Sequence, residues 1–146
     1  MRLMLALIAV VAIGGACGDA AGPVPLLPPA LVGDGVDVTV LDDPAVPGAA
    51  VRVRFESRVG ARVFFHPCVR SVERRVLDGW LPEPPELRMC TAELFTIEVA
   101  GTRTEPVDVP VDLADGTYRF VFEVSAEGSD TMSRLVSRPF EVRGAP

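Results

Sequence analysis

Alternation of apolar and polar residues runs through the chain from residue 36 to residue 143. In the first stretch Val36, Val38 and Val40 are separated by single polar residues. A period of two places all the apolar side chains on one side of an extended backbone, which is typical of a half-buried β-strand. The pattern therefore predicts an all-β fold whose strands each bury one face.

Seven further segments carry β patterns and are separated by turn residues. Pro106 precedes one of them and Pro110 lies within it, which predicts an edge strand, because proline donates no hydrogen bond to a sheet. Pro139 interrupts the last segment. Asp78-Gly79 is a turn signal, and Trp80 after it is interpreted as a core residue. The seven segments are Val51–Phe55, Val63–Phe65, Val69–Val76, Ala92–Val99, Val107–Val111, Tyr118–Val124 and Met132–Val142.

Seven or eight short strands without a convincing helix predict a single antiparallel β-sandwich. The segment from Leu113 to Tyr118 resembles the tyrosine corner of immunoglobulin-like domains, in which a tyrosine follows a turn at the start of the penultimate strand. The resemblance implies an immunoglobulin-like or fibronectin-like sandwich over 36–143. Antibody domains have a cysteine two residues after that tyrosine, whereas this chain has Phe120, so their inter-sheet disulfide is not expected.

Residues 1–16 have the composition of an export signal. Arg2 supplies a positive charge, Leu3–Ile13 is an unbroken apolar run, and Gly14-Gly15-Ala16 are small. The run is shorter than the roughly 20 residues of a membrane-spanning helix. It matches the apolar part of a signal peptide, which predicts export.

The end of this leader resembles a bacterial lipoprotein signal. In that class a short motif ends at the cysteine that is lipidated and becomes the new N-terminus, and here the motif is Gly14-Gly15-Ala16-Cys17. The class usually has an aliphatic residue where Gly14 stands. The resemblance implies lipid on Cys17 and anchoring to a membrane, in the periplasm or on the cell surface. Cleavage after Ala16 or Ala20, which gives a secreted soluble protein, is the alternative, and an uncleaved anchor is a third.

Residues 17–35 are predicted to be a linker. Pro23, Pro25, Pro28 and Pro29 stand among Ala, Gly and Leu. Proline fixes φ and removes backbone donors, so we expect an extended stalk between the lipid and the sandwich. Residues 144–146 are expected to be a short tail.

The two cysteines that follow Cys17 are predicted to form a disulfide. An exported protein meets an oxidising environment, and Cys68 and Cys90 are an even pair. Joining them closes a loop of about 23 residues and contributes roughly 3 kcal/mol in the chain-entropy model. Two buried free thiols, or a metal site that uses both sulfurs, are the alternatives.

The chemistry of the chain disfavours catalysis. It has no lysine and one histidine, His66, and none of its serines lies in a G-x-S-x-G nucleophile elbow. The sequence therefore predicts a protein that is not an enzyme and that needs no cofactor. His66 and Met89 flank the predicted disulfide, and soft sulfur and imidazole ligands suit copper(I) or zinc. A disulfide beside a surface histidine and a packed methionine is the preferred interpretation, with no metal.

The formal net charge is −6. An acidic surface disfavours nucleic acid as a partner, so the expected partners are an envelope or extracellular protein and, through the lipid, a membrane. Acidic pairs in turns, Asp42-Asp43 among them, are interpreted as solvated. Five arginines on strands could form a basic stripe on one outer face, although exposed strand faces are routinely charged: Arg52, Arg54, Arg70, Arg74 and Arg75.

Two functions remain open at this point. The first is a noncatalytic envelope or cell-surface lipoprotein module that binds a ligand or supports an assembly, through loops or an edge strand. The second is a periplasmic protein that handles a metal or resembles a proteinase inhibitor. In that case the loop between Cys68 and Cys90, held by the disulfide, is the inhibitory segment.

Overall fold

The computed structural model describes residues 35–85 and 93–144. The predicted signal peptide 1–16, the lipidation site Cys17, nearly all of the linker 17–35 and the end of the tail 144–146 lie outside these residues. Cys90 also lies outside them.

The described residues form an all-β structure of nine strands, in which no helix occurs. The first, β1, covers the residues predicted from the alternation. With nine strands in the described part of the chain, the structure exceeds the seven or eight that the sequence predicts. The strands are β1 (Val36–Val40), β2 (Ala50–Ser57), β3 (Val63–Val76), β4 (Gly79–Pro82), β5 (Phe95–Ile97), β6 (Thr102–Asp108), β7 (Gly116–Ala126), β8 (Met132–Val136) and β9 (Phe140–Val142).

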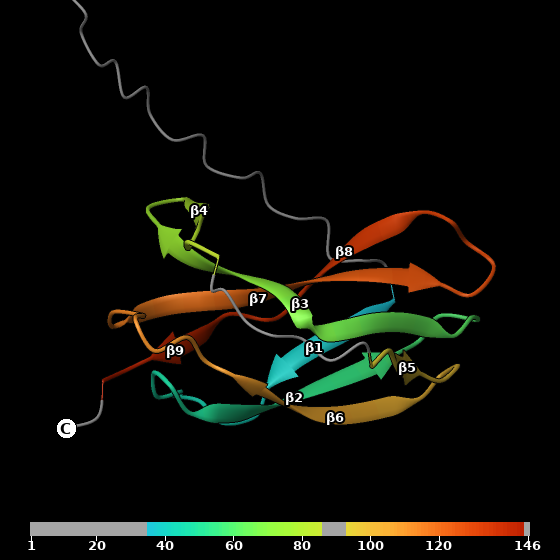
Figure 1. Cartoon of the computed structure of the whole chain (residues 1–146), viewed down its shortest axis with the longest axis horizontal. Coiled ribbons are helices and arrows are strands. Elements are labelled where there is room, and N and C mark those ends of the chain that lie inside the picture. The colour runs from blue at the N-terminus through green and yellow to red at the C-terminus, as the bar shows by residue number, and fades with distance from the viewer. Residues whose placement is uncertain (1–34, 86–92, 145–146) are drawn as a thin grey trace, which may run out of the picture.

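The strands make two antiparallel sheets that face each other in two layers (Figure 1). The smaller sheet has the order β1-β2-β6. The larger sheet has the order β4-β3-β7-β8, and it also holds β5 against β3 and β9 against β7. Each inter-strand ladder within the sheets is antiparallel, and a single parallel bridge joins Ala45 to Val142.

The two predicted strands Val63–Phe65 and Val69–Val76 are one long strand, β3. Its register against β7 shifts between Phe65 and Arg70, so the four residues between them form an irregularity in one strand. The first half of β3 pairs with β5 and the second half pairs with β4. One strand thus supports two separate neighbours on the same edge.

The core lies between the sheets and is rich in phenylalanine. Phe55 of the smaller sheet is fully buried, and its ring centroid lies 4.5 Å from that of Phe65 and 5.2 Å from that of Phe122, both in the larger sheet. Phe120 stacks on Phe140 at 4.8 Å. The contacts of Phe55 join the two sheets, whereas Phe120 and Phe140 stack within the larger sheet. Phe55, Phe65, Phe120 and Phe122 occupy alternating positions of β2, β3 and β7, so the period of two in the sequence produces the core directly.

The edge position predicted from prolines is confirmed in the smaller sheet. Pro106 lies in β6, and β6 is an outer strand that pairs with β2 alone within the described residues. The last residue of the predicted strand, Val111, is 63% exposed and lies beyond β6, whereas Val107 and Val109 are buried as expected.

Tyr118 ties the start of β7 to the turn before it. Its hydroxyl donates a hydrogen bond of 2.8 Å to the carbonyl oxygen of Ala114, and its ring is fully buried. Burial raises the pKa of this hydroxyl, which keeps it protonated as a donor. This is the contact that a tyrosine corner makes.

Replacing Tyr118 with phenylalanine is expected to lower the free energy of unfolding by about 0.5–1.5 kcal/mol, because one buried hydrogen bond is lost while the ring remains. Urea unfolding followed by fluorescence measures the change. An unchanged midpoint would show that the hydroxyl does not stabilise the turn.

Candidate functional site

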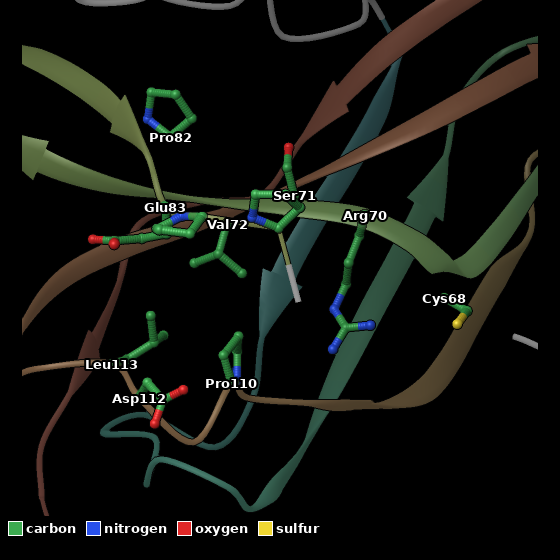
Figure 2. A pocket seen from close by; sticks show the side chains of 11 residues that line it. Cys68, Arg70, Ser71, Val72, Pro82, Glu83, Pro110, Asp112 and Leu113 are labelled. Carbon is green, nitrogen blue, oxygen red and sulfur yellow. The ribbon is translucent and has the colours of Figure 1, made fainter. Parts of the chain in front are cut away.

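A pocket of about 510 Å³ opens at one side of the two sheets (Figure 2). Its back wall is the middle of β3, with Cys68, Arg70 and Val72. Residues 82–85 form one side, and the opposite side is the segment 110–113 that follows β6. The pocket therefore lies between the larger sheet and the segment that joins β6 to β7, beside the chain that leaves β4.

Arg70 supplies the positive charge of this pocket. Its side chain points from β3 toward the segment after β6 (Figure 2). Its Nη1 donates to the carbonyl oxygen of Pro67 at 3.2 Å, and its Nη2 donates to the carbonyl oxygen of Asp108. The guanidinium carbon also lies 5.7 Å from the centre of the Phe120 ring. Arg70 thus connects the two sheets while its guanidinium borders the open space.

Two carboxylates face the same pocket. Glu83 Oε1 pairs with Arg74 Nε at 3.1 Å, and the Glu83 amide donates to the carbonyl oxygen of Val72 at 2.9 Å. Asp112 lies across the pocket and is exposed. Charges of both signs therefore line the rim.

The rest of the pocket wall is apolar and rigid. Pro82, Pro84, Pro85 and Pro110 contribute ring surfaces, and Leu113 packs against the core. Proline has little conformational freedom to lose when a ligand binds. The arrangement suits the binding of a small apolar group that carries a charge.

A second cluster lies on the outer face of the larger sheet. Glu73 of β3 is fully buried and pairs with its cross-strand neighbour Arg119 of β7. Glu73 Oε2 accepts a hydrogen bond from Arg119 Nε at 2.7 Å and forms an ion pair with Arg119 Nη2 at 2.6 Å, while Oε1 accepts from Arg134 Nη2 of β8 at 2.6 Å. The Arg119 guanidinium lies 4.2 Å from the Trp80 ring centre. We call Glu73, Arg119, Arg134 and Trp80 the outer ion cluster.

Trp80 was expected in the core, and this expectation is wrong. It lies in β4 opposite Arg75, is partly exposed, and covers Arg119 from outside. The reason is the register of the β3–β4 hairpin: Trp80 pairs with Arg75, which lies two residues from Glu73 and so shares its outer face. Sequence alternation alone does not show that a lone Trp covers a buried charge.

The residues around the predicted disulfide are described only in part. His66 and Cys68 lie in the irregular part of β3, where the Cys68 amide donates to His66 Nδ1 at 3.3 Å. Met89 and Cys90 lie outside the described residues, so the Cys68–Cys90 bond and the metal alternative stay predictions. Within residues 35–85 and 93–144, no three His, Cys, Asp or Glu side chains are grouped to hold a metal ion.

The five arginines proposed as one basic stripe do not share a face. Arg52 and Arg54 belong to β2 of the smaller sheet. The other three belong to β3 of the larger sheet, where Arg75 occupies the opposite face of the strand from Arg70 and Arg74. A single stripe is therefore wrong, because the sequence pattern does not say which sheet a strand joins.

The acidic pair Asp42-Asp43 is satisfied by the protein itself. Asp43 Oδ1 accepts from the Glu141 amide at 2.9 Å. Asp42 accepts from the Arg52 amide at 2.7 Å and from Arg52 Nη2 at 2.6 Å. These hydrogen bonds with Arg52 lower the pKa of Asp42 from 3.8 to about 2.

This lowered pKa predicts a pH dependence of stability. A carboxylate whose pKa is lower in the folded protein stabilises the fold above its unfolded pKa, and this contribution is lost as the pH falls from about 4 toward 2. Above pH 4 the native protein should therefore have a higher urea midpoint of unfolding than Asp42→Asn. The difference between the two midpoints should disappear near pH 2. A gap that is constant between pH 5 and pH 2 would contradict the pairing with Arg52.

Comparison with known proteins gives little help. No family model matches the chain, and no curated protein matches its sequence. Among solved structures it is similar to Pseudomonas fluorescens alkylpurine DNA glycosylase AlkC bound to DNA containing an abasic site analog, at 15% identity and a TM-score of 0.38. The match covers 75% of this chain and 30% of that one. A likeness at this level carries no argument about activity.

The partner prediction is corrected on this finding. From the acidic net charge, the sequence predicted an envelope or extracellular protein and a membrane as partners, and no nucleic acid. The similar solved structure is that of a protein bound to DNA. Net charge is an average over the whole surface, so it does not describe a local patch.

Among the described residues, no helix is long and apolar enough to cross a membrane.

Proposed function

We propose that the chain is a noncatalytic binding or structural module of an exported lipoprotein. In this proposal Cys17 carries the lipid, residues 17–35 form the stalk, and the two sheets form an immunoglobulin-like, fibronectin-like sandwich. The observation that carries the proposal is the leader that ends in Gly14-Gly15-Ala16-Cys17, followed by a folded region that begins at Val36.

The strand order supports the immunoglobulin-like assignment. A three-stranded sheet β1-β2-β6 faces a sheet in which β3 and β7 are central neighbours. The chain passes between the sheets from β2 to β3, from β5 to β6 and from β6 to β7, and immunoglobulin-like folds also connect their two sheets by Greek-key crossings. Tyr118 supplies the second support, because its hydroxyl reaches back four residues to the Ala114 carbonyl.

The pocket beside Arg70 supports binding better than catalysis. Its charged groups are a guanidinium and two carboxylates, and Glu83 is already paired with Arg74. A general acid or base works best with a pKa near the operating pH. Guanidinium remains charged near neutral pH, so Arg70 can orient an anionic group but cannot act as a base.

The mass of the mature protein tests the exported lipoprotein directly. The full chain is expressed in a bacterial host, and the membrane fraction is digested and measured by mass spectrometry. We expect an N-terminal peptide that begins at Cys17 with an added diacylglycerol, and we expect Cys17→Ser to lose that acyl mass. A mature N-terminus after Ala20, without an acyl group, would overturn the lipoprotein assignment.

A further inference from the structure

The two sheets have open edges that differ in how they are protected. Backbone groups on an edge strand are able to pair with another chain unless something blocks them. The outer strands of the smaller sheet are β1 and β6. In the larger sheet β4 and β5 share one outer edge, and β8 and β9 share the other. In an antiparallel ladder, alternate residues point their N–H and C=O groups toward the neighbour and away from it.

Two edges carry a proline at an outward-pointing position. The Val109 amide bonds to the Ala49 carbonyl, so by alternation Pro106 of β6 points its backbone outward. The Glu83 amide bonds to the Val72 carbonyl, so Pro82 of β4 also points outward. Each proline removes a donor that an incoming strand needs, so the β6 edge and the β4 part of its edge are protected. On β5, which forms the rest of the β4 edge, the Thr96 carbonyl accepts from Arg103 Nη1 at 3.2 Å.

Other parts of the chain cover a third edge and half of the fourth. The Arg138 amide donates to the Val38 carbonyl at 2.8 Å, which covers the outward side of β1. Ala45 lies against β9, since its amide donates to the Glu141 carbonyl at 2.8 Å and its carbonyl accepts from the Arg143 amide at 3.0 Å. The β9 part of the fourth edge is thus occupied, and the β8 part remains.

The β8 edge lacks these protections. The Ser137 amide donates to the Phe120 carbonyl at 2.9 Å, so by alternation Met132, Arg134 and Val136 point their backbone groups away from β7. Within the described part of the chain β8 pairs with β7 alone, and it contains no proline. In Figure 1 it lies at the outside of the larger sheet, beyond β7.

We propose that β8 is the docking edge of this module and that it pairs with an extended polypeptide segment that carries a carboxylate opposite Arg134. This inference rests on the proposed binding function and specifies where and what the module binds. The segment would add a strand beside β8 and form main-chain hydrogen bonds with Met132, Arg134 and Val136.

Charge selects this occupant. The segment from Met132 to Arg138 carries two arginines and no acidic residue. Arg134 stands opposite Glu123 of β7 and reaches across β7 to give Nη2 to Glu73, yet its side chain is 43% exposed, so part of it remains accessible to a strand that pairs with β8. Opposite charges on neighbouring strands attract across the pair. An acidic side chain in the incoming strand therefore fits next to Arg134.

A second copy of the chain fits this edge poorly. Antiparallel pairing of two β8 strands through all three outward residues would place Arg134 directly beside Arg134 of the other copy. Like charges opposite each other destabilise a strand pair. A net charge of −6 on each copy adds long-range repulsion.

The test uses the full chain labelled with nitrogen-15 and a synthetic peptide, acetyl-Ser-Val-Thr-Glu-Thr-Val-Ser-amide, with its glutamine analogue as the comparison. We expect saturable amide shift changes centred on β8. We also expect the glutamine peptide to bind about twofold to fivefold more weakly. Arg134→Gln should abolish the difference between the two peptides.

Met132→Pro removes an outward donor from β8 without removing a hydrogen bond to β7, and it should abolish binding. Thr104→Pro is the matched control, because Thr104 points outward from β6, and it should bind as the native chain does. Unchanged core aromatic shifts show that both variants fold.

Several results would overturn the inference: no β8 shifts at millimolar peptide, equal loss in both proline variants, or concentration-dependent β8 shifts without peptide. Displacement of the peptide from β8 by a single-stranded oligonucleotide would assign the edge to nucleic acid instead. An absent acyl mass on Cys17 alongside normal peptide binding would remove the exported lipoprotein and leave the docking edge intact.

Discussion

Replacing Glu73 with leucine is expected to lower the free energy of unfolding by about 3–5 kcal/mol, because it leaves a buried arginine without its partner. The Arg119 side chain is 6% exposed, and its ion pair is with Glu73. Arg134 can turn into solvent, but Arg119 is enclosed between β3 and Trp80. Urea unfolding of the native and Glu73→Leu proteins measures the difference.

Two controls separate charge from packing. Glu127→Gln breaks the surface pair with Arg62, both partners of which are largely exposed, and should change stability far less. The double variant Glu73→Leu/Arg119→Leu removes both buried charges and should recover most of the loss. If Glu73→Leu is no more damaging than Glu127→Gln, the outer ion cluster does not stabilise the fold.

The second large effect is expected at Phe55. Replacing it with alanine should lower the free energy of unfolding by about 3–5 kcal/mol, because it opens a cavity between the sheets. Phe55 is fully buried, and its ring contacts Phe65 and Phe122 of the facing sheet at centroid distances of 4.5 Å and 5.2 Å. Thermal and urea unfolding both measure the loss.

Val111→Ala is the matched control for Phe55→Ala. Val111 is 63% exposed, although the sequence alternation placed it with the buried valines. Its replacement should change stability by less than about 0.5 kcal/mol. Equal losses in the two variants would mean that Phe55 does not hold the sheets together.

The sequence predicted the strands whose hydrophobic pattern is local. The alternation located β1 and the inward face of β7, since each depends on residues two apart, and the prolines located the edge position of β6. It did not predict that Val63–Phe65 and Val69–Val76 form one strand. That continuity depends on β7, which runs beside both segments despite the irregularity between Phe65 and Arg70.

The candidate site was less predictable because it depends on contacts distant in sequence. Glu73 and Arg119 become neighbours only through the register of β3 with β7. A charged residue in an alternating strand is ordinarily solvated, so nothing in the sequence around Glu73 indicates complete burial. Pro82 protects part of an edge and, with Pro84 and Pro85, lines the pocket, and both roles depend on the pairing of β3 with β4.

Residue-resolved amide exchange of β8, with and without the glutamate peptide, tests most directly whether this fold is a binding module with one receptive edge. In the free protein the amides of Ser133 and Leu135 should exchange slowly, because they bond to β7, while those of Arg134 and Val136 should exchange fast. Peptide should slow Arg134 and Val136 and leave the β6 amide of Thr104 fast. Slow exchange at Arg134 and Val136 before peptide is added, or no slowing after it, would contradict the account.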